Sequence, residues 1–101
     1  MKKSLIALSL VVSLFAGMSA FAADTAALYK GRCAGCHGAD GSKSTSGMQA
    51  IQGMAVEDMA TKLEGYAKGS YGGKLKHTME GVAKKLSPEE IQALADYISK
   101  L

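Results

Sequence analysis

The sequence predicts an all-α, single-domain protein, and three observations lead to this prediction. Apolar residues recur at helical spacing in two stretches, residues 56–63 and residues 91–101. After residue 22, no stretch of useful length alternates polar and apolar side chains as a half-buried strand would. Glycine-rich segments separate the apolar stretches, so we expect about four short helices joined by glycine-rich loops.

The first 22 residues have the features of an export signal. Residues 1–3 (MKK) are positively charged, residues 5–15 are mostly apolar, and residues 20–22 (AFA) match the small-x-small pattern of a signal-peptidase site. An uncleaved membrane anchor is the alternative, because residues 4–23 carry no charge and are long enough to span a bilayer. We expect residues 1–22 to be cleaved. Residues 23–101 should then form a monomeric domain in the periplasm, with no membrane span.

The composition of the mature chain limits its possible functions. Removal of the leader takes away Lys2 and Lys3, so the formal net charge falls from +3 to +1. This near-neutral charge offers no electrostatic case for binding nucleic acid. The remaining 79 residues contain no Trp and no Phe, because both Phe residues lie in the leader. We expect so small a domain, with so few large side chains, to recruit another group to fill its core.

The first element of the mature chain is predicted to be a short helix that runs toward Cys33. Asp24 or Thr25 is its expected N-cap, since both side chains can accept a hydrogen bond from a free backbone N–H. Leu28 and Tyr29 are its large side chains, and we expect them to face the core.

A loop, an amphipathic helix and a second loop are predicted for the middle of the chain. Residues 38–53 contain four glycines among polar residues, which is typical of a loop. Residues 56–63 then have apolar side chains at helical spacing, and the helix should stop near Gly65 or Gly69. A second glycine-rich loop follows at residues 69–73.

The last element has the strongest local signals. Ser87 is a predicted N-cap, Pro88 occupies the first helical position and Glu90 completes a capping box. Residues 91–101 then present one apolar face, so we expect this helix to reach the C-terminus.

Both cysteines lie in the run Cys33-Ala34-Gly35-Cys36-His37, which has the C-x-x-C-H pattern of a c-type haem attachment site. Residues i and i+3 share a helix face, so Cys33 and Cys36 can bond the two vinyl groups of one haem. His37 follows directly and is predicted to bind the iron as its proximal ligand. The run therefore predicts one covalently bound haem c.

Four alternatives use the same residues. A structural disulfide would close only a very small loop, and a thioredoxin-like pair would need a βαβ pattern around it. Zinc would need further ligands, and His77 is the one other histidine in the sequence. A chance match is the fourth alternative. The export signal, the small size and the missing core bulk favour haem.

The second axial position of the iron separates an electron carrier from a haem enzyme. An open position favours oxygen, peroxide or gas chemistry, whereas a closed His/Met site favours electron transfer. Met79 is the preferred second ligand, because it lies 42 residues beyond His37 and just before the capped helix. His77 is its main competitor, since imidazole also binds haem iron. The other methionines of the mature chain are weaker candidates: Met48, Met54 and Met59.

Taken together, these residues resemble the small class I monohaem cytochromes c, and among them the c-553 type of sulfate-reducing bacteria. The similarity covers nearly all of the mature chain. It includes CAGCHGADGS at residues 33–42, the glycine–tyrosine segment at residues 65–73 and ADYISKL at residues 95–101. It implies a small all-α fold wrapped around one haem.

The resemblance also implies roles for individual residues. Cys33 and Cys36 carry the thioethers, His37 is the proximal ligand and Met79 is the distal ligand. The N-terminal helix packs across the C-terminal helix near Tyr97. Two further tyrosines resemble those near the haem edge in the family, although an ordinary loop or core position explains them equally well: Tyr66 and Tyr71.

Two departures from the wider family concern the iron ligands. Many members have a proline whose carbonyl orients the proximal histidine, but no proline occurs between His37 and Ser87. We therefore expect another backbone carbonyl to accept the His37 Nδ1–H. Many members also have proline after the distal methionine, where Glu80 follows Met79 in this chain, so the ligand loop is expected to be less rigid.

The function implied by the resemblance is that of a carrier, not an enzyme. It would shuttle single electrons between periplasmic oxidoreductases such as formate dehydrogenase or hydrogenase. The alternatives are a haem enzyme or gas sensor with a vacant sixth site, and a copper or zinc carrier without haem. Lysines around the haem edge are candidates for steering acidic partners, with an ordinary solvated surface as the alternative: Lys30, Lys43, Lys74, Lys76, Lys84 and Lys85.

Overall fold

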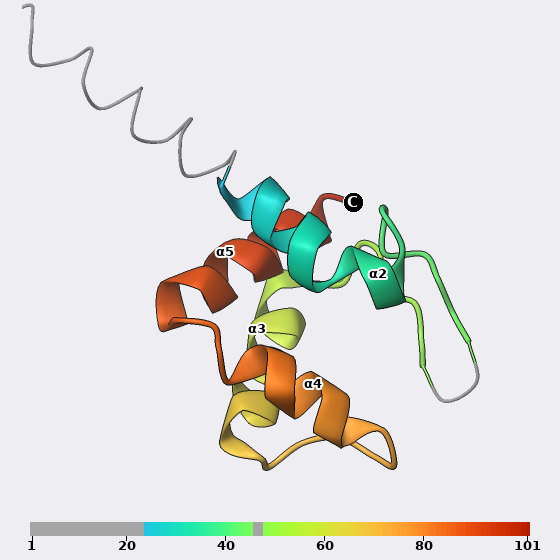
Figure 1. Ribbon diagram of the computed structural model, residues 1–101. Helices are drawn as coiled ribbons and strands as arrows, with labels where there is room; N and C mark the ends of the chain where they lie inside the picture. The colour runs from blue at the N-terminus through green and yellow to red at the C-terminus, as the bar shows by residue number, and fades with distance from the viewer. Residues whose placement is uncertain (1–23, 46–47) are drawn as a thin grey trace, which may run out of the picture.

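The computed structural model describes residues 24–45 and 48–101, and most of these residues are helical (Figure 1). The helices are residues 24–32, α2 (Ala34–His37), α3 (Val56–Lys68), α4 (Lys76–Ala83) and α5 (Pro88–Ser99). Within the two described ranges there is no strand, and the one β-bridge is an isolated pair, Thr45 and Met48. The predicted all-α fold is confirmed.

The start of α5 follows its sequence signals. The Ser87 hydroxyl accepts a hydrogen bond from the Glu90 N–H at 3.1 Å, and the Glu90 carboxylate accepts one from the Ser87 N–H at 2.8 Å. Pro88 loses no hydrogen bond at the first helical position, because an N–H there would have no partner within the helix. The predicted capping box is confirmed.

The end of α5 differs from the prediction by two residues. The helix stops at Ser99 and not at the C-terminus. The N–H groups of Lys100 and Leu101 instead donate to carbonyls three residues earlier, both at 3.1 Å. This tighter spacing closes the last turn, and Leu101 still packs against the core.

α3 is the central helix of the fold, because it packs against both α4 and α5. It ends at Lys68, and Gly69 follows in the left-handed conformation with φ 73°. The predicted stop at Gly69 is therefore confirmed. The buried core gathers around this helix: Tyr29, Met59, Ala60, Leu63, Leu86, Ile91, Leu94, Ala95 and Ile98.

The N-terminal helix lies across α5, as the family resemblance implies (Figure 1). Tyr29 is only 1% exposed, and its ring centroid lies 5.2 Å from that of Tyr97 on α5. Aromatic rings at this separation contribute packing energy beyond that of the buried area. Leu28 is partly buried against the same core.

The predicted N-cap of this first helix was wrong. Asp24 and Thr25 are both helical themselves, so neither is the residue that precedes the helix. The position that would cap the helix falls outside the described residues.

α4 was not predicted, and it places Met79 on a helix where a loop was expected. The segment KHTMEGVA has no side-chain N-cap and contains Gly81, so its local sequence favours a helix only weakly. Packing against α3 compensates, since Ala83 is fully buried and Met79 lies against the core. Tertiary contacts commonly stabilise helices of this kind.

The predicted leader, residues 1–22, lies outside the described residues. Among the helices of the described ranges, none combines the length and the apolar character that crossing a bilayer requires.

Candidate functional site

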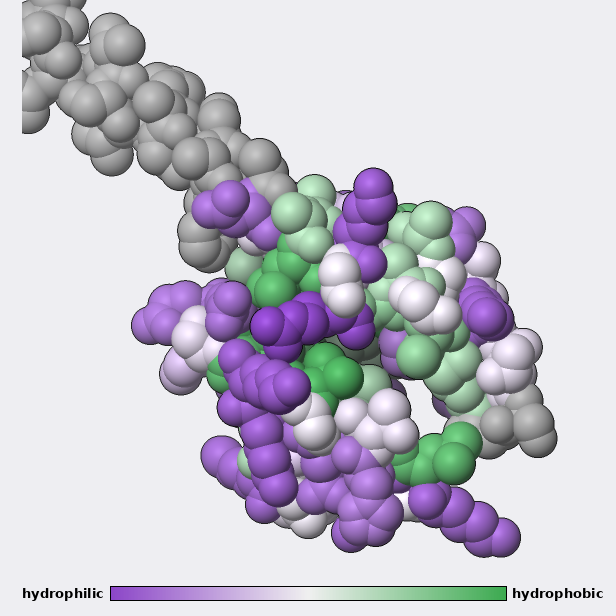
Figure 2. Space-filling model, viewed as in Figure 1, coloured by the Kyte–Doolittle hydropathy of each residue, from purple (hydrophilic) through white to green (hydrophobic). Residues whose placement is uncertain are grey.

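A pocket of about 980 Å³ lies between α2, α3 and α4. Figure 2 shows it as an opening between the part of the molecule that carries α2 and the part that carries α4. Small-molecule sites usually measure about 300–1,000 Å³, so this pocket is at the upper end of that range. It is large enough for a sizeable cofactor.

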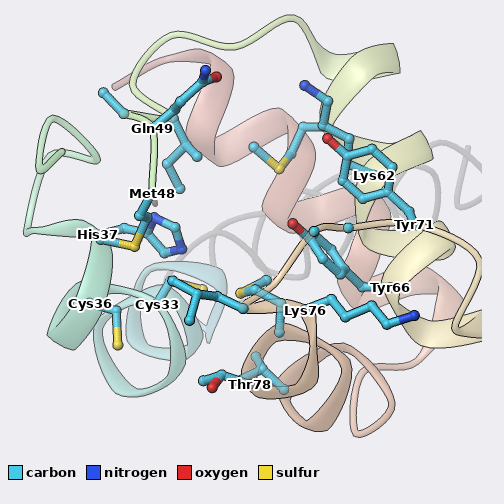
Figure 3. A pocket seen from close by; sticks show the side chains of 18 of the residues that line it. Cys33, Cys36, His37, Met48, Gln49, Lys62, Tyr66, Tyr71, Lys76 and Thr78 are labelled. Atoms are coloured by element: carbon cyan, nitrogen blue, oxygen red, sulfur yellow. The ribbon is translucent and has the colours of Figure 1, made fainter. Parts of the chain in front are cut away.

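The pocket brings together the four residues that the sequence predicts as a site, three of which Figure 3 labels: Cys33, Cys36 and His37. Cys36 and His37 line it from α2, Cys33 lines it from the position just before α2, and Met79 lines it from α4. His77, the competing candidate, is absent from the lining. Its side chain is 87% exposed, and its Nδ1 lies 3.4 Å from the Glu80 carboxylate.

Backbone hydrogen bonds hold the short helix α2 in place at both ends. The Cys33 N–H donates to the Tyr29 carbonyl at 2.8 Å, and the Gly38 N–H donates to the Ala34 carbonyl at 2.9 Å. The Tyr29 hydroxyl also donates to the Gly38 carbonyl at 2.8 Å. Tyr29 therefore links the crossing of the terminal helices to the segment that bears the cysteines.

The two cysteines lie in different surroundings. Cys33 is half-buried and Cys36 is exposed. Burial raises the pKa of the Cys33 thiol to about 11, although Arg32 opposes this rise. Cys33 is thus protonated near neutral pH.

The His37 imidazole is buried, with 8% of the residue exposed. Burial lowers its pKa, so the ring is neutral near pH 7 and keeps a nitrogen lone pair for a metal. Within the described part of the chain, its Nδ1 has no hydrogen-bond partner.

The predicted carbonyl partner of His37 Nδ1 stays a prediction, because no described residue supplies it. Two carbonyls of the loop that follows α2 are already used by other donors. The Gly38 carbonyl accepts from Tyr29 and Gly41, and the Gly41 carbonyl accepts from the N–H groups of Ile51 and Gln52.

The residues of the pocket fit a c-type haem. Two thiols at i and i+3, a neutral imidazole and a thioether face one largely apolar space. These are the groups that attach and ligate haem in electron carriers. Three more methionines line the same pocket, and Met59 is also part of the buried core, as predicted: Met48, Met54 and Met59.

The charged residues of the lining have one sign. Of the described acidic residues, none lines the pocket. Lys30, Lys84 and Lys85 were also predicted at the haem edge, but they do not line it. Sequence reasoning missed Arg32 and Lys62, although Lys62 lies three residues from Met59 on the same helix and is half-buried. The basic residues of the lining are Arg32, Lys43, Lys62, Lys74 and Lys76.

Tyr66 and Tyr71 form one wall of the pocket. Their rings meet edge to face, with centroids 4.9 Å apart and an interplanar angle of 81°. Two glycines make this contact possible. A Cβ on Gly65 would lie 2.6 Å from the Tyr71 Cβ, and one on Gly72 would lie 2.7 Å from the Tyr66 Cε1.

The chain is similar to known proteins along its whole length. The family model described as cytochrome c matches residues 22–101. Cytochrome c-553 of Nitratidesulfovibrio vulgaris is 50% identical over 103 residues, which cover all of both chains. Cytochrome c-553 of Desulfomicrobium norvegicum is 43% identical over 70 residues, which cover 69% of this chain and 86% of the relative. Cytochrome c-553 of Helicobacter pylori is 38% identical over 102 residues, which cover 100% of this chain and 99% of the relative.

Proposed function

Because the chain belongs to the cytochrome c family, we propose that it is a periplasmic electron carrier whose haem iron is held by His37 and Met79. Cytochromes c carry covalently attached haem c, and in this chain Cys33 and Cys36 attach it. The chain is thus a haem-containing electron carrier. The axial ligands, the compartment and the partners make up the proposal.

The observation that carries the proposed ligation is the shared pocket of His37 and Met79. The two residues come from different helices, α2 and α4, and both side chains face the same space as the cysteines. His37 offers a neutral imidazole nitrogen, and Met79 offers a thioether sulfur. When bound, the haem supplies one-electron chemistry, which a closed His/Met site favours.

The charge of the pocket supports acidic protein partners. The rim combines basic residues with Leu75, which is 59% exposed and lies between Lys74 and Lys76 in sequence. A small apolar contact inside a ring of cations suits brief encounters with an acidic surface. Periplasmic oxidoreductases such as formate dehydrogenase or hydrogenase are the proposed class of partner.

The ligation is tested by replacing Met79. The ferrous Met79→Ala protein should bind carbon monoxide readily at neutral pH, and the oxidised protein should lose the methionine–iron charge-transfer band. Met54→Ala is the matched control, since Met54 is a second methionine of the pocket, and His77→Ala tests the competing ligand. Both should behave as the wild type. A Met79→Ala protein that keeps the band and excludes carbon monoxide would contradict the proposal.

The compartment is tested by the intact mass of protein expressed in a host that exports cytochromes. The proposal predicts a chain that begins at Ala23 and carries one haem. A haem-bearing chain that retains residues 1–22 would overturn the proposed cleavage and would leave the ligation untouched.

A further inference from the structure

The first turn of α4 has few groups of its own that fix its position, although Met79 follows it directly. No side chain caps its N-terminus, and no acidic residue lies within that turn. The buried residue of α4 is Ala83, at the other end of the helix, and none of residues 76–78 is buried. A helix start with so few contacts is expected to open readily unless another group anchors it.

The side chain of Glu80 is such an anchor. Only 13% of this side chain is exposed, although it ends in a carboxylate. One carboxylate oxygen lies 3.4 Å from the Nδ1 of His77, in the first turn of α4. The other oxygen faces Gly69, which ends α3, since a Cβ on Gly69 would lie 3.1 Å from it. Glu80 therefore joins the first turn of α4 to the end of α3.

The glycine at position 69 allows the carboxylate to come this close. Gly69 has a φ of 73°, in the left-handed region, and its N–H donates to the Tyr66 carbonyl at 3.1 Å. A side chain at this position would be strained by the backbone and would also crowd Glu80. The same glycine thus ends α3 and leaves room for the Glu80 carboxylate.

Of the two contacts of the carboxylate, the one with Gly69 matters more. The His77 side chain is 87% exposed, and an ion pair with so exposed a partner contributes little to stability. The contact with Gly69 instead joins two helices that pack against each other (Figure 1). We therefore attribute the anchoring to the fit of the Glu80 side chain and not to its charge.

Met79 and Glu80 are neighbours in the chain, but their side chains have different surroundings. Met79 lines the pocket, whereas Glu80 does not. Successive residues of an α-helix point about 100° apart, so Glu80 can contact α3 while Met79 faces the pocket. Because one helical turn carries both residues, a shift of Glu80 also shifts Met79.

We propose that Glu80 is a positioning residue for Met79, and that its side chain, held against Gly69, slows the departure of Met79 from the iron. Glu80 lies outside the pocket lining, so it acts through α4 and does not touch the haem. This role rests on the proposed ligation of the iron by His37 and Met79.

Imidazole binding to the oxidised holoprotein tests this role, because imidazole can take the sixth position of the iron only after Met79 has left it. At saturating imidazole, the rate of the absorbance change equals the rate at which Met79 leaves. Glu80→Ala should raise this limiting rate several-fold. Glu80→Gln should leave it near the wild-type value, since the side chain keeps its size and one oxygen.

Two variants of α5 are the controls. Ser87→Ala removes one hydrogen bond of the capping box, so it lowers the stability of the fold and leaves Glu80 in place. Glu89→Ala removes an exposed carboxylate. Neither substitution should raise the limiting rate.

Equal limiting rates for Glu80→Ala and the wild type would overturn the role of Glu80. An equal rise in Ser87→Ala would overturn it too, because it would indicate a general loosening of the fold. A Glu80→Gln protein as fast as Glu80→Ala would also contradict it.

The methionine–iron charge-transfer band of the oxidised wild type is recorded in the same sample before imidazole is added. Its absence would refute the proposed ligation by Met79 and with it the role of Glu80. Its presence together with unchanged limiting rates would refute the role of Glu80 alone.

Discussion

At the scale of single residues, Tyr29 connects the core of the fold to the haem attachment segment. Its ring packs against Tyr97 where the terminal helices cross, and its hydroxyl donates to the Gly38 carbonyl at the end of α2. The periodic pattern predicts that Tyr29 is buried. It does not predict the hydrogen bond, because Gly38 comes next to Tyr29 only when α2 turns back against the first helix.

Replacing Tyr29 with phenylalanine should lower the free energy of unfolding of the holoprotein by about 1 kcal/mol, the usual net value of one hydrogen bond. Guanidinium denaturation measures this loss. Tyr97→Phe is the control, because the Tyr97 hydroxyl has no hydrogen-bond partner among the described residues. Equal losses in both variants would show that the hydroxyl bond to Gly38 contributes nothing.

Because the Tyr29 hydroxyl can ionise, we expect the free energy of unfolding to depend on pH through this residue. Burial is the main cause that raises the pKa of Tyr29 above its ordinary value of about 10, so the folded protein holds this proton more tightly than the unfolded chain. Stability from this source is complete below about pH 10 and decreases as pH rises further. The advantage of the wild type over Tyr29→Phe should therefore be constant below about pH 10 and narrow as pH rises above it. A constant difference would contradict this.

At the scale of elements, α5 and α4 differ in how far their own sequences specify them. Ser87, Pro88 and Glu90 give α5 a start signal that is entirely local, so it could be predicted. α4 has no side-chain cap and a glycine within it, and its stability depends on contacts with α3. Because such contacts join segments distant in sequence, Met79 was expected on a loop.

Two glycines within helices allow a matched test of the close packing between α3 and the Tyr71 side chain. An alanine Cβ at Gly65 would lie 2.6 Å from the Tyr71 Cβ, whereas one at Gly81 would meet nothing within 4 Å. Gly65→Ala should lower the free energy of unfolding by about 1 kcal/mol, because overpacking outweighs the gain in helix propensity. Gly81→Ala should raise it by roughly 0.5–1 kcal/mol. Thermal unfolding compares the two, and stabilisation by both substitutions would refute the close packing.

At the scale of the whole molecule, the positions of Cys33, Cys36 and His37 in one site could be predicted, because five consecutive residues carry the pattern. Met79 in the same pocket was also predicted, from its distance along the chain and its place before α5. The basic residues of the pocket lining were predicted only in part. Lys62 reaches the pocket from α3 and Arg32 from the end of the first helix, through packing that no local pattern describes.

The distribution of charge predicts which lysines matter for association with an acidic partner. Lys74→Glu should slow electron exchange with such a partner several-fold at low salt, because it reverses a charge at the pocket. Lys84→Glu makes the same change on an exposed residue outside the lining and should have a smaller effect. Stopped-flow rates at several ionic strengths compare the two. Electron-exchange rates that do not change with ionic strength would indicate that these lysines are ordinary solvated side chains with no role in association.

If His37 and Met79 close the iron site of this cytochrome c, as we propose, the ferrous iron has no free position for a gas ligand. The most direct measurement is the absorbance spectrum of the ferrous wild-type holoprotein under carbon monoxide at neutral pH. A closed His/Met site should give a spectrum that carbon monoxide leaves unchanged. Rapid conversion to the carbon monoxide adduct would contradict it and would instead favour a haem enzyme or gas sensor with an open sixth site.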